Sequence, residues 1–262
     1  MEVDYYKKLF QTIGNIIELI EKDDMPKYLL FLENAFPYMD NYNYHKGMNG
    51  IIQELTGLLK TKNIGTDSDR ALLLDFQATL ETKPEKAIKL EKDALAQIET
   101  ITADNARLVS NLHANLGGLY RMNAHPDLAR EHMEKNISLL DQFNLLHIND
   151  SIPQIANYAM FLTEQQEPER GISELQKLSG IIKEYHSDEC LDYAKVQEIL
   201  GTIYLMTANL SHAKTHFKKA FKIYEKIWAD EPEMIEAKYR EIQELYPQIG
   251  FSIGKTLSGL LT

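Results

Sequence analysis

The chain has 262 residues, of which 44% are hydrophobic, and it contains only 13 glycines and 8 prolines. So few turn-forming residues disfavour a strand-rich fold and favour long helices. A net charge of -11 would repel the phosphate backbone of a nucleic acid and an anionic membrane surface, so we expect no nucleic acid and no membrane as partner, but a protein or peptide segment.

The N-terminal segment carries charged residues early and lacks the apolar core of a signal peptide, and the chain has no apolar run of about 18 residues. Its single cysteine, Cys190, excludes an internal disulfide and a cysteine-based zinc site, and it suits a reducing compartment. We therefore expect a cytoplasmic protein that does not span a membrane.

The first predicted helix covers Val3–Glu21, where apolar residues recur on one face and a polar turn follows. Residues 26–60 predict a further helix pair, Lys27–Phe36 and His45–Leu59, which does not keep the register of the repeats that follow. We expect residues 1–65 to form a capping helix and a degenerate helix pair.

An internal repeat of 42 residues begins after this segment. One column of the repeat holds small residues, as a close crossing of two helices requires: Ala87, Ala129, Gly171 and Ala213. Three residues before the small residue stands a proline in three repeats: Pro84, Pro126 and Pro168. Proline is tolerated in the first turn of a helix, so each predicts the start of the second helix of a pair.

The first helix of each pair is marked by two apolar columns that lie four residues apart and so share one helix face. The first column is Leu74, Leu116, Tyr158 and Leu200. The second column is Ala78, Tyr120, Leu162 and Tyr204.

Together these columns resemble the tetratricopeptide repeat. The fourth repeat reproduces the signature spacing of that family with Leu200, Gly201, Tyr204, Ala213, Phe217 and Ala220. The step of 42 is longer than the usual period of about 34 and resembles the kinesin-light-chain variety, in which an asparagine often precedes the first helix's Leu-Gly or Leu-Ala pair, as Asn115 and Asn157 do. The first repeat departs from the pattern at Asp75 and Glu91.

The resemblance implies an all-α fold, a right-handed α-solenoid of antiparallel helix pairs. We expect repeats at residues 66–107, 108–149, 150–191 and 192–233, with a partial repeat at 234–246. Residues 247–262 should form a C-terminal capping segment over the last apolar face.

Candidate chemistry is weak throughout. Residues 250–256 resemble a phosphate-binding loop, but the glycine spacing is one residue short and no strand precedes it. His212 and His216 have the spacing of two metal ligands on a helix, but no third ligand is evident. No nucleophile motif or converging carboxylate pair occurs, so we expect no enzyme, no cofactor and no metal.

The resemblance also implies that the first helix of each pair lines a concave groove. The residues expected there are Asn111, Asn115, Gly118, Arg121, Met122, Asn157, Met160, Thr163, Lys195, Glu198, Thr202 and Leu205. Asparagine amides can both donate to and accept from a peptide main chain, and apolar residues could hold its side chains.

The sequence therefore favours an interaction module, an adaptor or scaffold that binds a peptide or protein segment in its groove. One alternative is a regulatory receptor, in which residues 1–65 change position when a peptide fills the groove. A third hypothesis is an enzyme subunit, which fold resemblance alone does not exclude.

Overall fold

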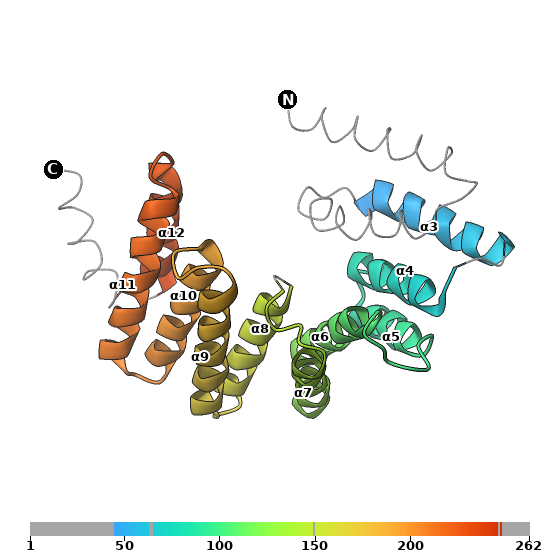
Figure 1. Ribbon diagram of the computed structural model, residues 1–262, viewed down its shortest axis with the longest axis horizontal. Helices are drawn as coiled ribbons and strands as arrows, with labels where there is room; N and C mark the ends of the chain where they lie inside the picture. Colours follow the sequence, from blue (N-terminus) through green and yellow to red (C-terminus); the bar gives the residue numbers. More distant parts are fainter. Residues whose placement is uncertain (1–44, 63–64, 149, 246, 248–262) are drawn as a thin grey trace. The chain divides into compact units, whose positions relative to one another are not determined.

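The computed structural model describes residues 45–62, 65–148, 150–245 and 247. Within these residues it contains ten α-helices and no strand, so the expected all-α helical repeat fold is confirmed (Figure 1). The helices are α3 (His45–Lys62), α4 (Asp67–Leu80), α5 (Pro84–Leu95), α6 (Ala106–Met122), α7 (Pro126–Gln142), α8 (Ser151–Glu164), α9 (Pro168–Tyr185), α10 (Leu191–Met206), α11 (Leu210–Ile227) and α12 (Pro232–Leu245). The predicted helix pair member His45–Leu59 matches α3, whereas Val3–Glu21, Lys27–Phe36 and residues 248–262 lie outside the described part of the chain.

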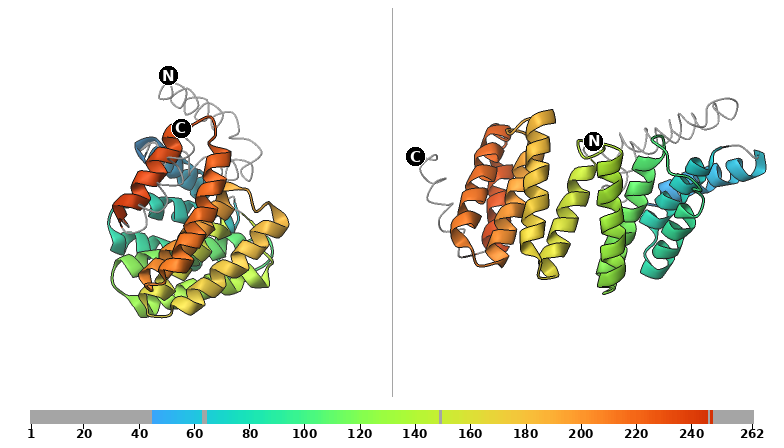
Figure 2. Two further views of the ribbon diagram at one scale, coloured as in Figure 1. Left: turned by 90° about the vertical axis from the view of Figure 1, so that its left-hand side faces the viewer. Right: turned by 60° about the horizontal axis from the view of Figure 1, so that its bottom comes forward.

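The chain divides into two compact units, Met1–Leu139 and Leu140–Thr262. In the first unit α3 packs on α4, α4 on α5, and α5 on α6. In the second unit α8 packs on α9, α9 on α10, α10 on α11, and α11 on α12, and successive helices from α8 to α11 run antiparallel (Figures 1 and 2). No described helix is long and apolar enough to cross a membrane.

Proline starts the second helix of a pair where the sequence predicted it. Helices α5, α7 and α9 begin at Pro84, Pro126 and Pro168, and α11 begins at the equivalent position, Leu210. The small column is buried as expected, with Ala87 2% exposed and Ala129 and Ala213 fully covered. These residues sit where the two helices of a pair cross.

Three of these helix crossings are close because one of the two helices carries a glycine. From one pair to the next, the glycine alternates between the first helix and the second helix. A Cβ on Gly117 of α6 would meet Met133 Cγ at 2.6 Å and the Ala129 carbonyl oxygen at 3.4 Å. In the next pair the glycine is Gly171 of α9, and its Cβ would lie 2.5 Å from the carbonyl oxygen of Ala159 on α8. In the last pair the glycine returns to the first helix as Gly201, which faces Phe217. Each of these crossings therefore has one glycine and one alanine at equivalent positions.

The turn inside each of these pairs uses a left-handed residue at the 42-residue step. Ala124, Gln166 and Ala208 have φ values of 57°, 65° and 58°. In each turn the next residue's N–H donates to the carbonyl five positions earlier, for example from Asn209 to Tyr204 over 2.7 Å. This is the hydrogen bond of a Schellman helix end, in which glycine is the favoured left-handed residue.

We therefore expect Ala208→Gly to stabilise the second unit by about 0.5–1 kcal/mol, because glycine adopts positive φ without the Cβ clash. The same change at Ala237, an exposed residue inside α12, should destabilise by about 1 kcal/mol. Urea denaturation of both variants checks the opposite signs. Equal destabilisation by both changes would contradict the assignment of strain to residue 208.

Candidate binding surface

A cavity of about 530 Å³ opens between the first helices of successive pairs in the second unit, α8 and α10, and reaches α12. Its apolar lining is Ile152, Pro153, Ala156, Val196 and Ile199. Its polar lining is Asn157, Asp192, Lys195, Glu198 and Lys238. The structure thus brings together three of the predicted groove residues, Asn157, Lys195 and Glu198. It adds Lys238, which the sequence did not predict because residues 234–246 match only part of a repeat.

A hydrogen-bonded network fixes one side of this cavity. Lys238 Nζ lies 2.8 Å from Glu198 Oε1 and 3.0 Å from Glu241 Oε2. The hydroxyl of Tyr224 on α11 donates to Glu198 Oε2 over 2.6 Å. Burial, followed by the charge of Glu198, raises the pKa of Tyr224, which keeps the hydroxyl protonated as a donor. Burial alone would lower the pKa of Lys238, but its contacts with Glu198 and Glu241 outweigh that effect and raise the pKa.

The opposite side of the cavity is open. Asn157 is exposed on α8. Lys195 is 54% exposed, and its Nζ is 3.6 Å from Asp192 in a pair one helical turn apart. An exposed pair of this kind contributes little stability and can exchange for a ligand group. The cavity therefore combines a fixed polar wall, an apolar floor and two accessible polar side chains.

Two predicted groove residues are buried instead, and this part of the prediction is wrong. Thr163 is 6% exposed, its hydroxyl donates to the Ala159 carbonyl over 2.9 Å, and it lies beside Gly171 of α9. Leu205 is 8% exposed and packs in a core cluster with Phe217 of α11. Both face the second helix of their own pair. Thr202 is half-buried and donates to the Glu198 carbonyl, and Met160 is half-buried.

In the first unit, Asn115 is engaged inside the protein. Its amide nitrogen donates to Asp75 Oδ1 over 2.8 Å and to Glu91 Oε1 over 3.1 Å. Burial, the neighbouring Asp75 charge and a hydrogen bond to Asp75 raise the pKa of Glu91, and the Asn115 hydrogen bond only partly opposes them, so that the pKa is about 10. Asp75 and Glu91, the two residues that depart from the repeat pattern, therefore form one buried polar cluster with Asn115 that joins α4, α5 and α6. Of the other predicted residues here, Asn111, Gly118 and Arg121 are half-buried, and Met122 is 83% exposed.

The paired histidines serve packing. His212 and His216 both stack on the ring of Tyr204, at centroid distances of 4.9 and 5.2 Å, and His216 Nδ1 is 2.9 Å from Gln197 Oε1. Burial lowers the pKa of His216 to about 4, so the ring is neutral near pH 7. Within the described residues, no group of three potential ligands could hold a metal ion.

Residues 151–226, which span α8 to α11, match the family model for the tetratricopeptide repeat. Over these residues the chain consists of tetratricopeptide repeats. Among solved structures, the repeat protein resembles the nearly identical repeats of a putative kinesin light chain from P. anserina, with 14% identity, a TM-score of 0.61, and coverage of 79% of this chain and 100% of that one. It also resembles BtubC (BKLC) from P. vanneervenii, with 16% identity, a TM-score of 0.52, and coverage of 78% and 75%. At these identities the likeness shows the shared fold alone. The comparison with curated proteins found no match for the repeat protein.

Proposed function

We propose that this repeat protein is an adaptor or scaffold that binds a peptide or protein segment on the surface where α8, α10 and α12 meet. Tetratricopeptide repeats are generally protein interaction modules, and the fold is typically not catalytic. The observation that supports the site is the cavity of about 530 Å³, because it is lined by the first helices of consecutive repeats. Its size is within the range of about 300–1,000 Å³ usual for ligand pockets.

The two sides of the cavity suit different parts of an extended peptide. Asn157 carries both a donor and an acceptor, so it can hydrogen-bond a peptide main chain with little demand on the side chains. The aliphatic floor, which includes Ile152 and Ile199, can cover an apolar side chain of that peptide. The Glu198–Lys238–Tyr224 network holds the polar wall in place without a ligand, which lowers the ordering cost of binding.

The test uses peptides selected from a displayed random library on the purified chain, with their affinity measured by calorimetry. We expect Asn157→Ala and Lys195→Ala each to weaken binding by about five- to tenfold, as the loss of one hydrogen bond or charge contact requires. Lys222→Ala, an exposed change of the same kind on α11, is the matched control and should leave the affinity unchanged. If Asn157→Ala and Lys195→Ala bind the selected peptides as tightly as Lys222→Ala, the surface is elsewhere.

A regulatory receptor remains the alternative. It needs residues 1–65 to change position on peptide binding, and residues 1–44 lie outside the described part of the chain. X-ray scattering with and without a saturating selected peptide separates the two functions. A scaffold should keep its radius of gyration apart from the small change that the bound peptide itself adds, whereas a receptor should show a larger change. The cytoplasmic location likewise remains a prediction, supported by the single cysteine.

A further inference from the structure

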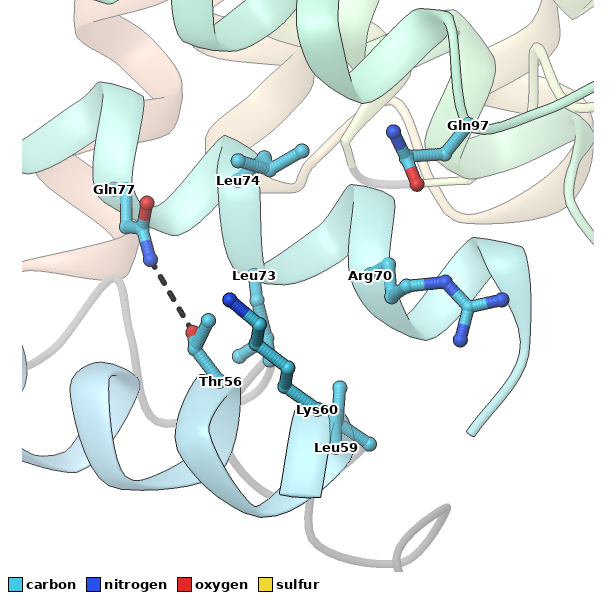
Figure 3. Close-up of a pocket in the computed structure, with 8 residues that line it drawn as sticks. All are labelled: Thr56, Leu59, Lys60, Arg70, Leu73, Leu74, Gln77 and Gln97. Carbon is cyan, nitrogen blue, oxygen red and sulfur yellow. Dashed lines mark hydrogen bonds between the residues drawn. The ribbon is translucent and has the colours of Figure 1, made fainter. Parts of the chain in front are cut away.

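A second cavity, of about 420 Å³, lies in the first unit and shares no residue with the surface on α8, α10 and α12. It is bounded by α3, α4 and the turn that follows α5 (Figure 3). Leu59, Leu73 and Leu74 form its apolar part. Leu59 and Leu73 are themselves 4% and 2% exposed, so this part of the cavity is the outer edge of the core between α3 and α4.

The polar groups around this apolar part are cationic or neutral. Lys60 extends from α3 toward α4, and Gln77 and Gln97 border the cavity from α4 and from the turn after α5 (Figure 3). Arg70 contributes a second cation, half-buried on α4. Among the described residues that line the cavity, none is an aspartate or a glutamate.

The two cations differ in how they are held. The Arg70 guanidinium is fixed by Asp67 and by the carbonyl of Gly65, on the same side of α4. Lys60 is exposed, and it has no carboxylate within ion-pair distance in the part of the chain that the structure describes. Arg70 is thus already paired with a carboxylate, whereas Lys60 is a cation that the described residues leave available in a chain whose net charge is -11. Such a site attracts an anionic group and disfavours a cationic one.

We infer that this cavity binds a short segment of a protein partner that presents an acidic side chain next to a branched aliphatic one. The carboxylate contacts Lys60, and the aliphatic side chain covers Leu74. Gln97 and Gln77 can hydrogen-bond the main chain of the segment through their amides. The site lies between α3 and α4 of the first unit, so it would bind a different part of a partner from the surface on α8, α10 and α12.

The probe is an acetylated and amidated peptide, Gly-Ser-Leu-Glu-Leu-Ser-Gly, whose glutamate is its only charge, compared with the same peptide containing glutamine. Titrations of the full chain are followed by amide chemical shifts in NMR, which report where the peptide binds. We expect shifts on α3 and α4 with the glutamate peptide and an affinity about five- to tenfold lower for the glutamine peptide. Lys60→Gln should remove this preference, whereas Lys89→Gln, an exposed charge loss on α5, should keep it.

A charge exchange gives an independent arm. The Lys60→Glu variant should no longer bind the glutamate peptide, and it should bind the same peptide with lysine in place of glutamate. The preference of the unchanged chain for the glutamate peptide over the glutamine peptide should weaken as salt is raised from about 0.05 to 0.5 M. Equal affinity for the glutamate and glutamine peptides, no shifts on α3 and α4, or shifts confined to α8–α12 would each overturn the inference. Binding of octanoate but not of the glutamate peptide would also overturn it, because the occupant would then be a free fatty acid. Since the two sites share no residue, failure here leaves the test on Asn157 and Lys195 unaffected.

Discussion

Replacing Gly171 with alanine is expected to destabilise the second unit by about 2–4 kcal/mol, the range for overpacking against a rigid contact. The new Cβ would lie 2.5 Å from the carbonyl oxygen of Ala159 and 3.2 Å from Thr163 Oγ1. The first of these atoms is backbone, so α8 and α9 must move apart to admit the methyl group. Urea denaturation followed by the fluorescence of Trp228, the single tryptophan, measures the loss because this residue stacks on Tyr224 in the second unit.

The matched control is on the same helix. Gly180 of α9 is exposed, and a Cβ there would meet nothing within 4 Å. Gly180→Ala should therefore stabilise by about 0.5–1 kcal/mol, the ordinary gain from replacing a helical glycine. The double change Ala159→Gly with Gly171→Ala copies the order found at Gly117 and Ala129, and it should recover part of the loss. Stabilisation by Gly171→Ala alone would show that the crossing is not close.

The repeat fold could be predicted because its constraints are periodic. A close crossing needs a small residue and a helix start tolerates proline, so both recur at every 42nd position and stand out from the sequence. This periodicity correctly predicted where the second helices begin, at Pro84, Pro126 and Pro168. The left-handed turn residues were not predicted, because Ala124, Gln166 and Ala208 are not the glycine or asparagine that normally marks such a position.

The groove residues could be predicted only in part, because the direction of a side chain depends on the rotation of its helix. Residues four apart share a face, and Ala159 and Gly201 face the second helices of their pairs. Thr163 and Leu205 follow them by four and must face the same way, into the core. The sequence contained this information, since the small column and the i+4 rule together exclude both positions from an exposed groove.

The buried acids could not be predicted from the repeat, since the pattern expects a small residue at 75 and an apolar one at 91. In later repeats the second position holds Met133, Leu175 and Phe217, all buried. Glu91 is 1% exposed at the same step, and Asp75 is 9% exposed. A carboxyl in such a place persists when it is neutral and hydrogen-bonded, and this needs Asn115 from the next pair.

Glu91→Gln is therefore expected to remove a pH dependence from the stability of the first unit. Folded Glu91 has a pKa of about 10 against an ordinary value of 4.5, so between these values the folded state holds a proton that the unfolded state has released. The stability that Glu91 contributes is complete below pH 4.5 and is lost as pH rises toward 10. From about pH 7 to 9 the unchanged chain should lose about 2–3 kcal/mol, since one extra proton in the folded state gives about 1.4 kcal/mol per pH unit.

Glutamine at position 91 is neutral at every pH and can still accept from Asn115, so this variant should keep its stability over the same interval. Burial lowers the pKa of His113, His132 and His216 below their usual range, so these rings stay neutral there and add no slope. Hydrogen exchange of α4 to α6, corrected for the intrinsic pH effect, measures the first unit, and Trp228 fluorescence gives the second unit as an internal control. Parallel slopes for Glu91→Gln and the unchanged chain would mean that Glu91 is ionised in the folded protein. A flat response confined to α4–α6 would show that a protonated acid, held by Asp75 and Asn115, replaces the apolar contact used in the other repeats.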